Sequence, residues 1–280
     1  MHAIYIDDLS EAEAINLKKQ LIKNPNSLIY PLNYHDRTEH IYPTENSLLQ
    51  KQLYKVESFT IKNQMKINEN KSKIMIFNKS KNYDFQPEFS FSSGKNLEVI
   101  EQTRLLGVEL TTDLRWTQNT ASIFKKAMSK MWLLRRMKNM HLEEKIICDY
   151  YIKEIRVLAE QAVAVWNSGL TKGQINDLEK IQKVALKIIL GDKYYSYSTA
   201  CHYFSLKSLS DRRLELCTKY AIKLYKSDRC EQFFDLPKVN TRCDNLVIIS
   251  QSRTKRCYNA PHNYLARLVN ENKHKIKKQA

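Results

Sequence analysis

Glycine and proline are scarce in this chain, with five Gly and six Pro among its 280 residues. Because these two residues interrupt helices and form many tight turns, their scarcity favours a mainly helical body. No apolar run reaches the length of about 18 residues that a membrane span needs, and no signal peptide opens the chain. We therefore expect a soluble, intracellular protein that has no membrane partner.

The cysteines lack the close pairing of common metal and redox motifs. Six are present, and none forms a C-x-x-C pair. Cys230, Cys243, Cys257 and His262 could be taken as zinc ligands, but the gaps between them match no usual zinc-finger spacing. We expect isolated, mostly buried thiols that stay reduced inside the cell.

Acidic residues are too few to balance the basic ones. The chain has 46 Lys and Arg against 30 Asp and Glu, a formal net charge of +16. Residues 1–60 hold six basic and eight acidic residues, whereas residues 61–140 hold 15 and seven, so the positive charge lies beyond the start. A basic body with an acidic start suits a polyanionic partner such as nucleic acid. The alternative is an ordinary basic protein of the cell interior.

Hydrophobic periodicity predicts an α+β fold that is predominantly helical. Strands are expected at residues 2–9, 74–77, 89–91 and 97–110, with Ser92-Ser93-Gly94-Lys95 as a hairpin loop. Helices are expected at residues 11–23, 44–64, 119–139, 142–167, 174–190 and 209–226, and irregular chain after Ser227. The composition changes near residue 115, which is the best candidate for a domain boundary.

The first motif with chemical meaning is Tyr5-Ile6-Asp7-Asp8. Nucleotidyl transfer uses two divalent metal ions about 3.5–4 Å apart, and adjacent carboxylates at a strand turn can hold them against an open cleft. Hard oxygen ligands of this kind suit Mg²⁺. Taken alone, the four residues fit a solvated acidic turn better than a metal site.

Two further motifs lie between residues 65 and 110. The loop Asn68-Glu69-Asn70-Lys71-Ser72-Lys73 precedes an apolar strand, and its lysines could reach a triphosphate. The alternative is an ordinary charged turn that binds no ligand. The run Thr103-Arg104-Leu105-Leu106-Gly107-Val108 contains one Gly, which marks a strand where another group approaches the backbone closely. That group could be a primer end or a packing neighbour.

The fourth motif is a basic helix around residues 125–136. Its cations could neutralise phosphates while Met128, Met131 and Leu134 pack inward. The alternative is a charged face that meets only solvent. The candidate phosphate-binding residues are Lys125, Lys126, Lys130, Arg135 and Arg136.

In their order along the chain, these motifs resemble the C-terminal half of a reverse transcriptase from a jockey-like non-LTR retrotransposon. That family has a Y-x-D-D turn, an N-x-x-K-[ST]-K segment before an apolar strand, an LLGV primer-grip strand and a basic helical thumb. Residues 154–166 and 178–189 are similar to the region that follows the thumb. The resemblance extends to about residue 270.

The resemblance assigns roles residue by residue. It implies that Asp7 and Asp8 bind Mg²⁺, that Tyr5 lies beside the primer terminus, and that Lys71 assists the departure of pyrophosphate. It also implies that Leu106 and Gly107 belong to the primer grip. The implied partners are an RNA template, a DNA primer and deoxynucleoside triphosphates, in the nucleus or in a cytoplasmic ribonucleoprotein.

The family's fingers and an earlier palm strand with another metal-binding Asp have no counterpart here. We therefore expect a fragment: a partial palm with a primer-grip hairpin at residues 1–115, a thumb at 116–170 and a helical extension with a basic tail at 171–280. Such a fragment would not polymerise by itself. The alternatives are a non-catalytic nucleic-acid-binding helical module and a genomic relic that does not fold.

Overall fold

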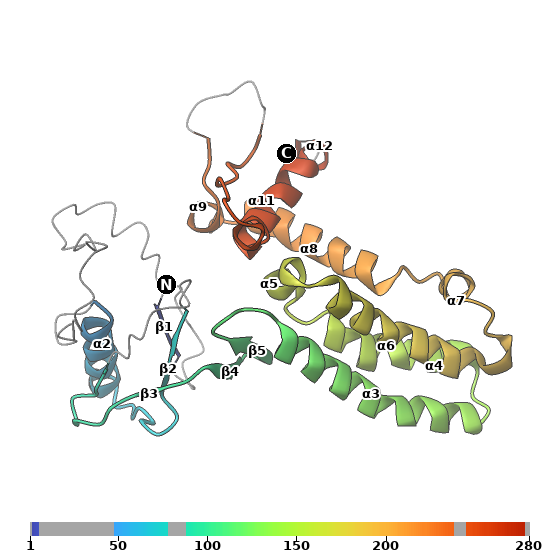
Figure 1. The fold of residues 1–280 in the computed structure, drawn as a ribbon, viewed down its shortest axis with the longest axis horizontal. Coiled ribbons are helices and arrows are strands. Elements are labelled where there is room, and N and C mark those ends of the chain that lie inside the picture. The colour runs from blue at the N-terminus through green and yellow to red at the C-terminus, as the bar shows by residue number, and fades with distance from the viewer. Residues whose placement is uncertain (1, 6–47, 78–87, 238–244, 278–280) are drawn as a thin grey trace. The chain divides into compact units, whose positions relative to one another are not determined.

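A computed structural model describes residues 2–5, 48–77, 88–237 and 245–277 (Figure 1). Helices dominate these residues, which confirms the predominantly helical class. The predicted helix at residues 11–23 lies outside them. The chain divides into two compact units, residues 1–103 and 104–280.

The first unit contains helix α2 (Leu48–Lys62) and a three-stranded sheet. The sheet has the order β1 (His2–Tyr5), β2 (Lys73–Ile76) and β3 (Glu98–Val99). β1 runs antiparallel to β2, and β2 runs parallel to β3. The register pairs Tyr5 with Lys73, so the C-terminal end of β1 lies opposite the start of β2.

A small core holds this unit together. It consists of buried apolar side chains from α2, β2 and the segment before β3, namely Leu53, Ile74, Phe89, Phe91 and Leu97. The predicted loop at residues 92–95 is confirmed as a tight turn, because the Phe91 N–H donates to the Lys95 carbonyl at 2.9 Å. Ser90 and Asn96 form an antiparallel bridge across that turn.

The prediction of a single strand at residues 97–110 is wrong. The chain instead forms β3, then β4 (Gln102–Leu105), and reverses into β5 (Val108–Thr111). The reversal occurs at Leu106 and Gly107, whose φ angles are 47° and 87°. Two successive residues with positive φ are characteristic of a two-residue hairpin turn. The apolar pattern alone does not reveal this turn, because Leu106 reads as a strand residue.

The second unit is a helical body that follows the β4–β5 hairpin (Figure 1). α3 packs along α6, and α8 packs against α11. The helices are α3 (Thr117–Asn139), α4 (Glu144–Tyr150), α5 (Val163–Trp166), α6 (Lys172–Leu190), α7 (Tyr197–Tyr203), α8 (Leu209–Tyr225), α9 (Cys230–Phe233), α10 (Lys255–Tyr258), α11 (Pro261–Glu271) and α12 (Lys273–Lys277).

One hydrophobic core extends through this second unit, from Val108 to Ile276. The ranges predicted as thumb (116–170) and extension (171–280) both contribute side chains to it. The division into palm, thumb and extension stays a prediction, because it refers to functional parts of a polymerase.

The longer predicted helices are confirmed with small shifts at their ends. α2, α3, α6 and α8 match the expected ranges. α6 begins two residues before the prediction because Thr171 and Gln174 form a capping box. It ends at Gly191, as expected, where φ is 58°.

The single helix predicted at residues 142–167 is wrong. α4 passes into a π-helical turn at Tyr151–Ile155 and a 3₁₀ turn at Arg156–Ala159. Ala162, with φ of 50°, then separates these turns from α5. A π turn shifts the side-chain register without changing the apolar composition, so a 3.6-residue periodicity does not detect it.

The irregular chain predicted after Ser227 is also wrong in part. α11 is an 11-residue helix with Pro at its first position. It buries Leu265, Ala266, Leu268 and Val269, which recur at helical spacing. The start signal and the apolar stripe were both readable in the sequence.

Candidate functional site

The two predicted metal ligands, Asp7 and Asp8, lie outside the described residues. The strand before them is described: β1 ends at Tyr5, opposite Lys73. Asp7 follows Tyr5 by two positions in the sequence, and Lys71 precedes Lys73 by two positions. The chain therefore leaves β1 and enters β2 at the same end of the sheet.

Asn68 organises the turn that carries Lys71. The Asn68 carbonyl accepts the Lys71 N–H and the Ser72 N–H, each at 3.1 Å. The Asn68 Oδ1 atom also accepts the Lys71 N–H at 3.3 Å, and the Ser72 hydroxyl donates to the Asn68 carbonyl at 3.0 Å. Asn is common in turns because its short side chain can accept a nearby backbone N–H in this way. The turn leaves Lys71 exposed, whereas Ser72 is buried.

Lys73 is engaged in an ion pair and is not available to a ligand in the way Lys71 is. Its ammonium group pairs with Glu98 on the neighbouring strand β3. The Ser93 hydroxyl donates to Glu69 at 3.0 Å, and Lys95 donates to Asn70. These contacts attach the 92–95 turn to the Asn68 turn.

The predicted primer-grip residues form the tip of the β4–β5 hairpin. Leu106 is 83% exposed at this tip. The Leu106 carbonyl accepts a hydrogen bond from the Gln161 side-chain amide at 3.3 Å. The lack of a Cβ at Gly107 makes room for that amide, since an added Cβ would lie 2.6 Å from Gln161 Nε2. Gln161 therefore ties the hairpin tip to the helical body.

The predicted basic helix is α3, which contains six Lys and Arg residues and no Asp or Glu. Met131 and Leu134 are buried, as expected, and Met128 is partly buried against the same core. Lys125, Arg135 and Arg136 are exposed, and Lys126 is partly exposed. The inward and outward faces of α3 thus match the amphipathic prediction.

The five predicted phosphate-binding cations on α3 differ in their partners. The Lys130 ammonium lies 2.9 Å from the Glu154 carboxylate and also donates to the Glu154 carbonyl at 3.1 Å. The remaining four are Lys125, Lys126, Arg135 and Arg136, and none of them forms an ion pair with another described residue. These four charges are available to an external anion, and Lys130 is partly neutralised.

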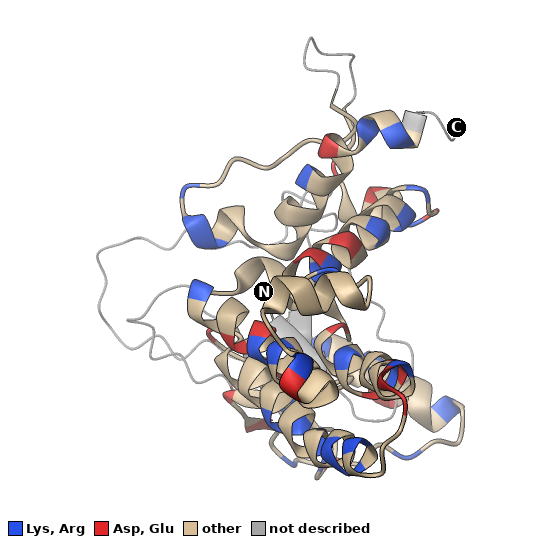
Figure 2. Cartoon of the chain, turned by 90° about the vertical axis from the view of Figure 1, so that its right-hand side faces the viewer, with Lys and Arg blue, Asp and Glu red and all other residues tan. Residues whose placement is uncertain are grey.

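Lys and Arg occur on several helices, with Asp and Glu among them (Figure 2). Acidic partners neutralise many of these cations. Glu215 on α8 accepts Lys219 at 2.7 Å and Lys207 at 3.0 Å, and these contacts lower the pKa of Glu215 to about 2. α3 differs from α8 because it carries no carboxylate of its own.

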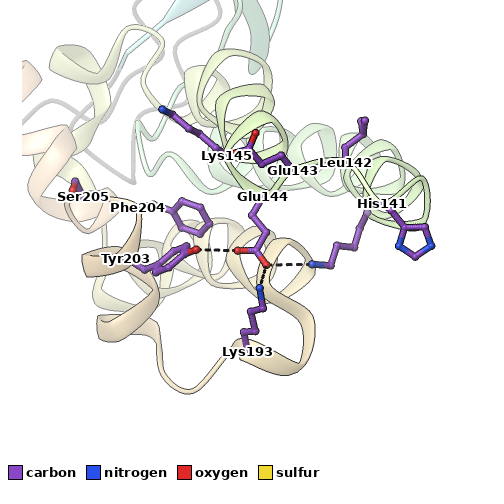
Figure 3. A pocket seen from close by; sticks show the side chains of 10 residues that line it. His141, Leu142, Glu143, Glu144, Lys145, Lys193, Tyr203, Phe204 and Ser205 are labelled. Atoms are coloured by element: carbon purple, nitrogen blue, oxygen red, sulfur yellow. Dashed lines mark hydrogen bonds and ion pairs between the residues drawn. The ribbon is translucent and has the colours of Figure 1, made fainter.

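A pocket of about 670 Å³ lies where the end of α3, the start of α4 and α7 meet. Figure 3 shows Glu144 between Lys193 and Tyr203, with the Lys145 side chain directed away from it. The Glu144 carboxylate accepts Lys193 Nζ at 2.9 Å and the Tyr203 hydroxyl at 3.2 Å. Lys138 lies 3.8 Å away. The hydrogen bond from Lys193 is the main cause that lowers the pKa of Glu144.

This arrangement ties three segments together, because the Glu144 carboxylate contacts Lys193, Tyr203 and Lys138. Glu144 and Lys193 neutralise one another, and Lys138 is also drawn to Glu144. We assign the pocket a structural role.

A buried polar network lies between α6, α7 and α8. Gln182, which is fully buried, accepts the Tyr151 hydroxyl at 2.9 Å and donates to the Lys207 carbonyl at 2.9 Å. Glu179 accepts the Leu209 and Ser210 N–H groups at 2.9 and 3.0 Å, and the Tyr197 hydroxyl also donates to it. Burial raises the pKa of Tyr151. The bonds to Glu179 join α6 to the first residues of α7 and α8, so the network supports the packing of the three helices.

The described cysteines are free thiols with no disulfide. Cys148, Cys201 and Cys217 are buried, and burial raises the pKa of Cys148 and of Cys217 to about 11. Such thiols stay protonated and unreactive near neutral pH. Cys243 lies outside the described residues. Among the described residues, no group of three or more His, Cys, Asp and Glu side chains is placed to hold a metal ion.

None of the helices in the described ranges combines the length and apolar character needed to span a membrane. Comparisons of the chain with protein-family models, curated proteins and solved structures found no match.

Two residues with a part in these sites were not predicted from the sequence. Gln161 contacts Leu106 from 55 positions away, and no local pattern indicates such a pair. Trp132 is 56% exposed on α3, and its position on the outer face could have been read from the helical spacing of Met131 and Leu134.

Proposed function

We propose that this chain is part of an RNA-directed DNA polymerase of the non-LTR retrotransposon kind, with a palm segment in residues 1–115 and a nucleic-acid-binding helical body after it. The observation that carries the proposal is the β1–β2 register. It brings the chain that continues to Asp7 and Asp8, and the turn that carries Lys71, to the same end of one sheet.

This convergence suits nucleotidyl transfer, because the reaction needs metal ligands and a cation near the same phosphates. Lys71 is exposed, and its ammonium group forms no ion pair with any residue of the described ranges, so it can reach a phosphate. Tyr5, the last residue of β1, would lie next to the primer terminus in this proposal.

Asp7 and Asp8 offer the oxygen donors that Mg²⁺ prefers. Bound there, Mg²⁺ would activate the primer hydroxyl and stabilise the leaving pyrophosphate. The chain's own contribution would be the two carboxylates and the Lys71 charge, which follow and precede the paired residues Tyr5 and Lys73 in the sequence.

A paramagnetic ion tests this proposal without requiring activity. Mn²⁺ replaces Mg²⁺ at oxygen sites and broadens NMR signals of nearby nuclei. We expect substoichiometric Mn²⁺ to broaden the backbone amide signals of residues 71–73, and Asp7→Asn with Asp8→Asn to abolish the effect. Broadening that persists in the double variant, or that is absent from residues 71–73 in the parent, would contradict the proposed metal site.

The resemblance assigns another metal-binding Asp to a palm strand that has no counterpart in these 280 residues. Because metal placement provides much of the rate of this reaction, we expect no primer extension by this chain alone. An extension assay with an RNA template, a DNA primer and Mg²⁺ measures this. Extension that Asp7→Ala abolishes would overturn the expectation of inactivity and support the polymerase assignment.

A second candidate function is nucleic-acid binding without catalysis, and α3 favours it. Helix α3 has no carboxylate, and four of its cations form no ion pair within the described part of the chain, an arrangement that suits phosphate groups. Binding of this kind releases counterions, so the affinity for RNA should fall steeply as salt rises. Filter binding at low and moderate salt tests it, and binding that does not respond to salt would count against it.

A further inference from the structure

Trp132 lies on the outer face of α3, where the helix meets solvent. The chain has three Trp residues, and Trp116 and Trp166 are buried with 6% and 0% exposure. Trp132 is 56% exposed. Its exposure leaves a large aromatic surface of α3 in contact with solvent.

The Trp132 ring has no partner within the described part of the chain. No hydrogen bond, ring contact or cation joins it. Two other aromatic rings of the second unit have a cation over them: Arg267 lies 3.7 Å from the Tyr258 ring centre, and Lys183 lies 5.3 Å from that of Tyr197. Trp132 thus offers an open aromatic face.

Cations and a hydroxyl surround this face along the helix. Lys125, Ser129, Trp132 and Arg136 are spaced by four, three and four residues, so they form one exposed stripe down α3. Neither Lys125 nor Arg136 is paired with a described acidic group. The stripe therefore combines an apolar plane with unneutralised positive charge on both sides.

From this combination we infer that the Lys125–Ser129–Trp132–Arg136 stripe binds single-stranded nucleic acid, with Trp132 stacking on an unpaired base and the two cations contacting flanking phosphates. This inference rests on the proposed nucleic-acid binding of α3 and names the form of its partner. The bases of a duplex are stacked on each other and do not present a face to an indole on a convex helix. An unpaired strand does, and stacking on aromatic side chains is the usual means of holding it.

Charge complementarity decides against an apolar protein partner for the same stripe. A partner for Trp132 alone would need an apolar pocket, yet Lys125 and Arg136 flank the ring and the helix has no acidic residue to balance them. A polyanion satisfies both the ring and the charges.

Tryptophan fluorescence tests the inference directly, because Trp132 is the solvent-exposed tryptophan and the other two are buried. Oligo(dT) and oligo(U) of about 12 nucleotides serve as probes, and a 12-base-pair duplex serves as the comparison. We expect both single strands to quench the emission of the parent protein. In Trp132→Phe, whose remaining tryptophans are buried, we expect the quenching to disappear.

Affinity measured by fluorescence anisotropy of labelled oligonucleotides gives the second readout. We expect Trp132→Ala to weaken binding of single strands by about 5- to 100-fold, as the loss of one stacked base implies. Trp132→Phe should retain part of the affinity. The duplex should be affected much less.

Phe59→Ala is the matched control. Phe59 is an aromatic residue on helix α2 of the first unit, with 54% exposure, close to that of Trp132. We expect this variant to bind single strands like the parent, with the circular dichroism of all variants unchanged. Equal weakening by Phe59→Ala would contradict a specific role for Trp132.

The result that overturns the inference is parent-like affinity of Trp132→Ala together with no quenching of the parent by oligo(dT) or oligo(U). If salt-dependent binding persisted in that case, the nucleic-acid proposal for α3 would stand and the stacking role would fail. Absence of any binding by the parent would overturn both.

Discussion

At the residue scale, Glu179 links two helices of the second unit through a buried carboxylate. It projects from α6 and accepts the first two N–H groups of α8, from Leu209 and Ser210. Helix N-termini have unpaired N–H groups, and a negative charge there also interacts favourably with the helix dipole. Glu179 is therefore a cap supplied by a neighbouring helix.

We expect Glu179→Ala to lower the free energy of unfolding by about 2–4 kcal/mol, because it leaves the buried Leu209 N–H, the partly buried Ser210 N–H and the Tyr197 hydroxyl without this acceptor. Urea unfolding followed by circular dichroism measures this loss. Asp177→Ala is the control, since Asp177 lies on the same helix in an exposed pair with Lys180 and should change stability by less than about 0.5 kcal/mol. Equal losses in the two variants would contradict the capping role.

Glu144 gives the fold a dependence on acid pH. Its pKa in the folded chain is lowered, chiefly by the hydrogen bond from Lys193. Its contribution to stability is therefore present above the pKa of the unfolded chain and is lost as the pH falls through the lower folded pKa. We expect the parent to lose more stability than Glu144→Gln between about pH 5 and about pH 3. Urea unfolding at both pH values checks this, and equal losses would refute it.

At the element scale, the β4–β5 hairpin depends on a turn that tolerates few side chains. Gly107 has a φ of 87° and faces the Gln161 amide. A residue with a Cβ would be strained by the backbone conformation and would displace Gln161, which holds the Leu106 carbonyl.

Gly107→Ala should destabilise the chain by about 1–2 kcal/mol from backbone strain, with a further loss from the displaced Gln161. In a Gln161→Ala background only the strain should remain, so the cost of Gly107→Ala should fall. Gly94→Ala provides the comparison, since Gly94 has a φ of 82° and open space around the added Cβ. Thermal unfolding of the four variants tests this, and an unchanged cost of Gly107→Ala in the Gln161→Ala background would contradict the contact.

The elements that the sequence predicts well are those whose signals are local. α3, α6 and α8 follow from apolar periodicity, and the end of α6 follows from Gly191. The π-helical turn at Tyr151–Ile155 and the reversal at Leu106 depend on backbone geometry that composition does not encode. Contacts between residues far apart in the sequence, such as Lys130 with Glu154 and Gln161 with Leu106, could be identified only from the folded structure.

Less of the candidate site than of the fold could be predicted from the sequence and compared with the structure. The sequence identified the α3 cations, and the structure adds that Lys130 is paired with Glu154. The structure also shows that hydrogen bonds to Asn68 form the turn that carries Lys71. The roles of Asp7 and Asp8 stay a prediction, because both lie outside the described residues.

At the scale of the whole molecule, the chain has a net charge of +16, and its helices differ in how many of their cations have an acidic partner. α8 neutralises part of its charge through Glu215, whereas α3 carries cations with no carboxylate on the same helix. A phosphate-bearing partner should therefore respond more to charges on α3 than to the same number of charges on α8.

Salt-dependent RNA binding by two matched double variants tests the proposed nucleic-acid interface most directly. Lys125→Ala with Arg136→Ala removes two charges from α3, and Lys219→Ala with Lys223→Ala removes two from α8. We predict that the α3 variant binds a single-stranded RNA at least about tenfold more weakly than the parent at low salt, with a slope of log affinity against log salt that is smaller by about 1.4. The α8 variant should stay close to the parent. Equal effects of the two variants on affinity and slope would contradict the account.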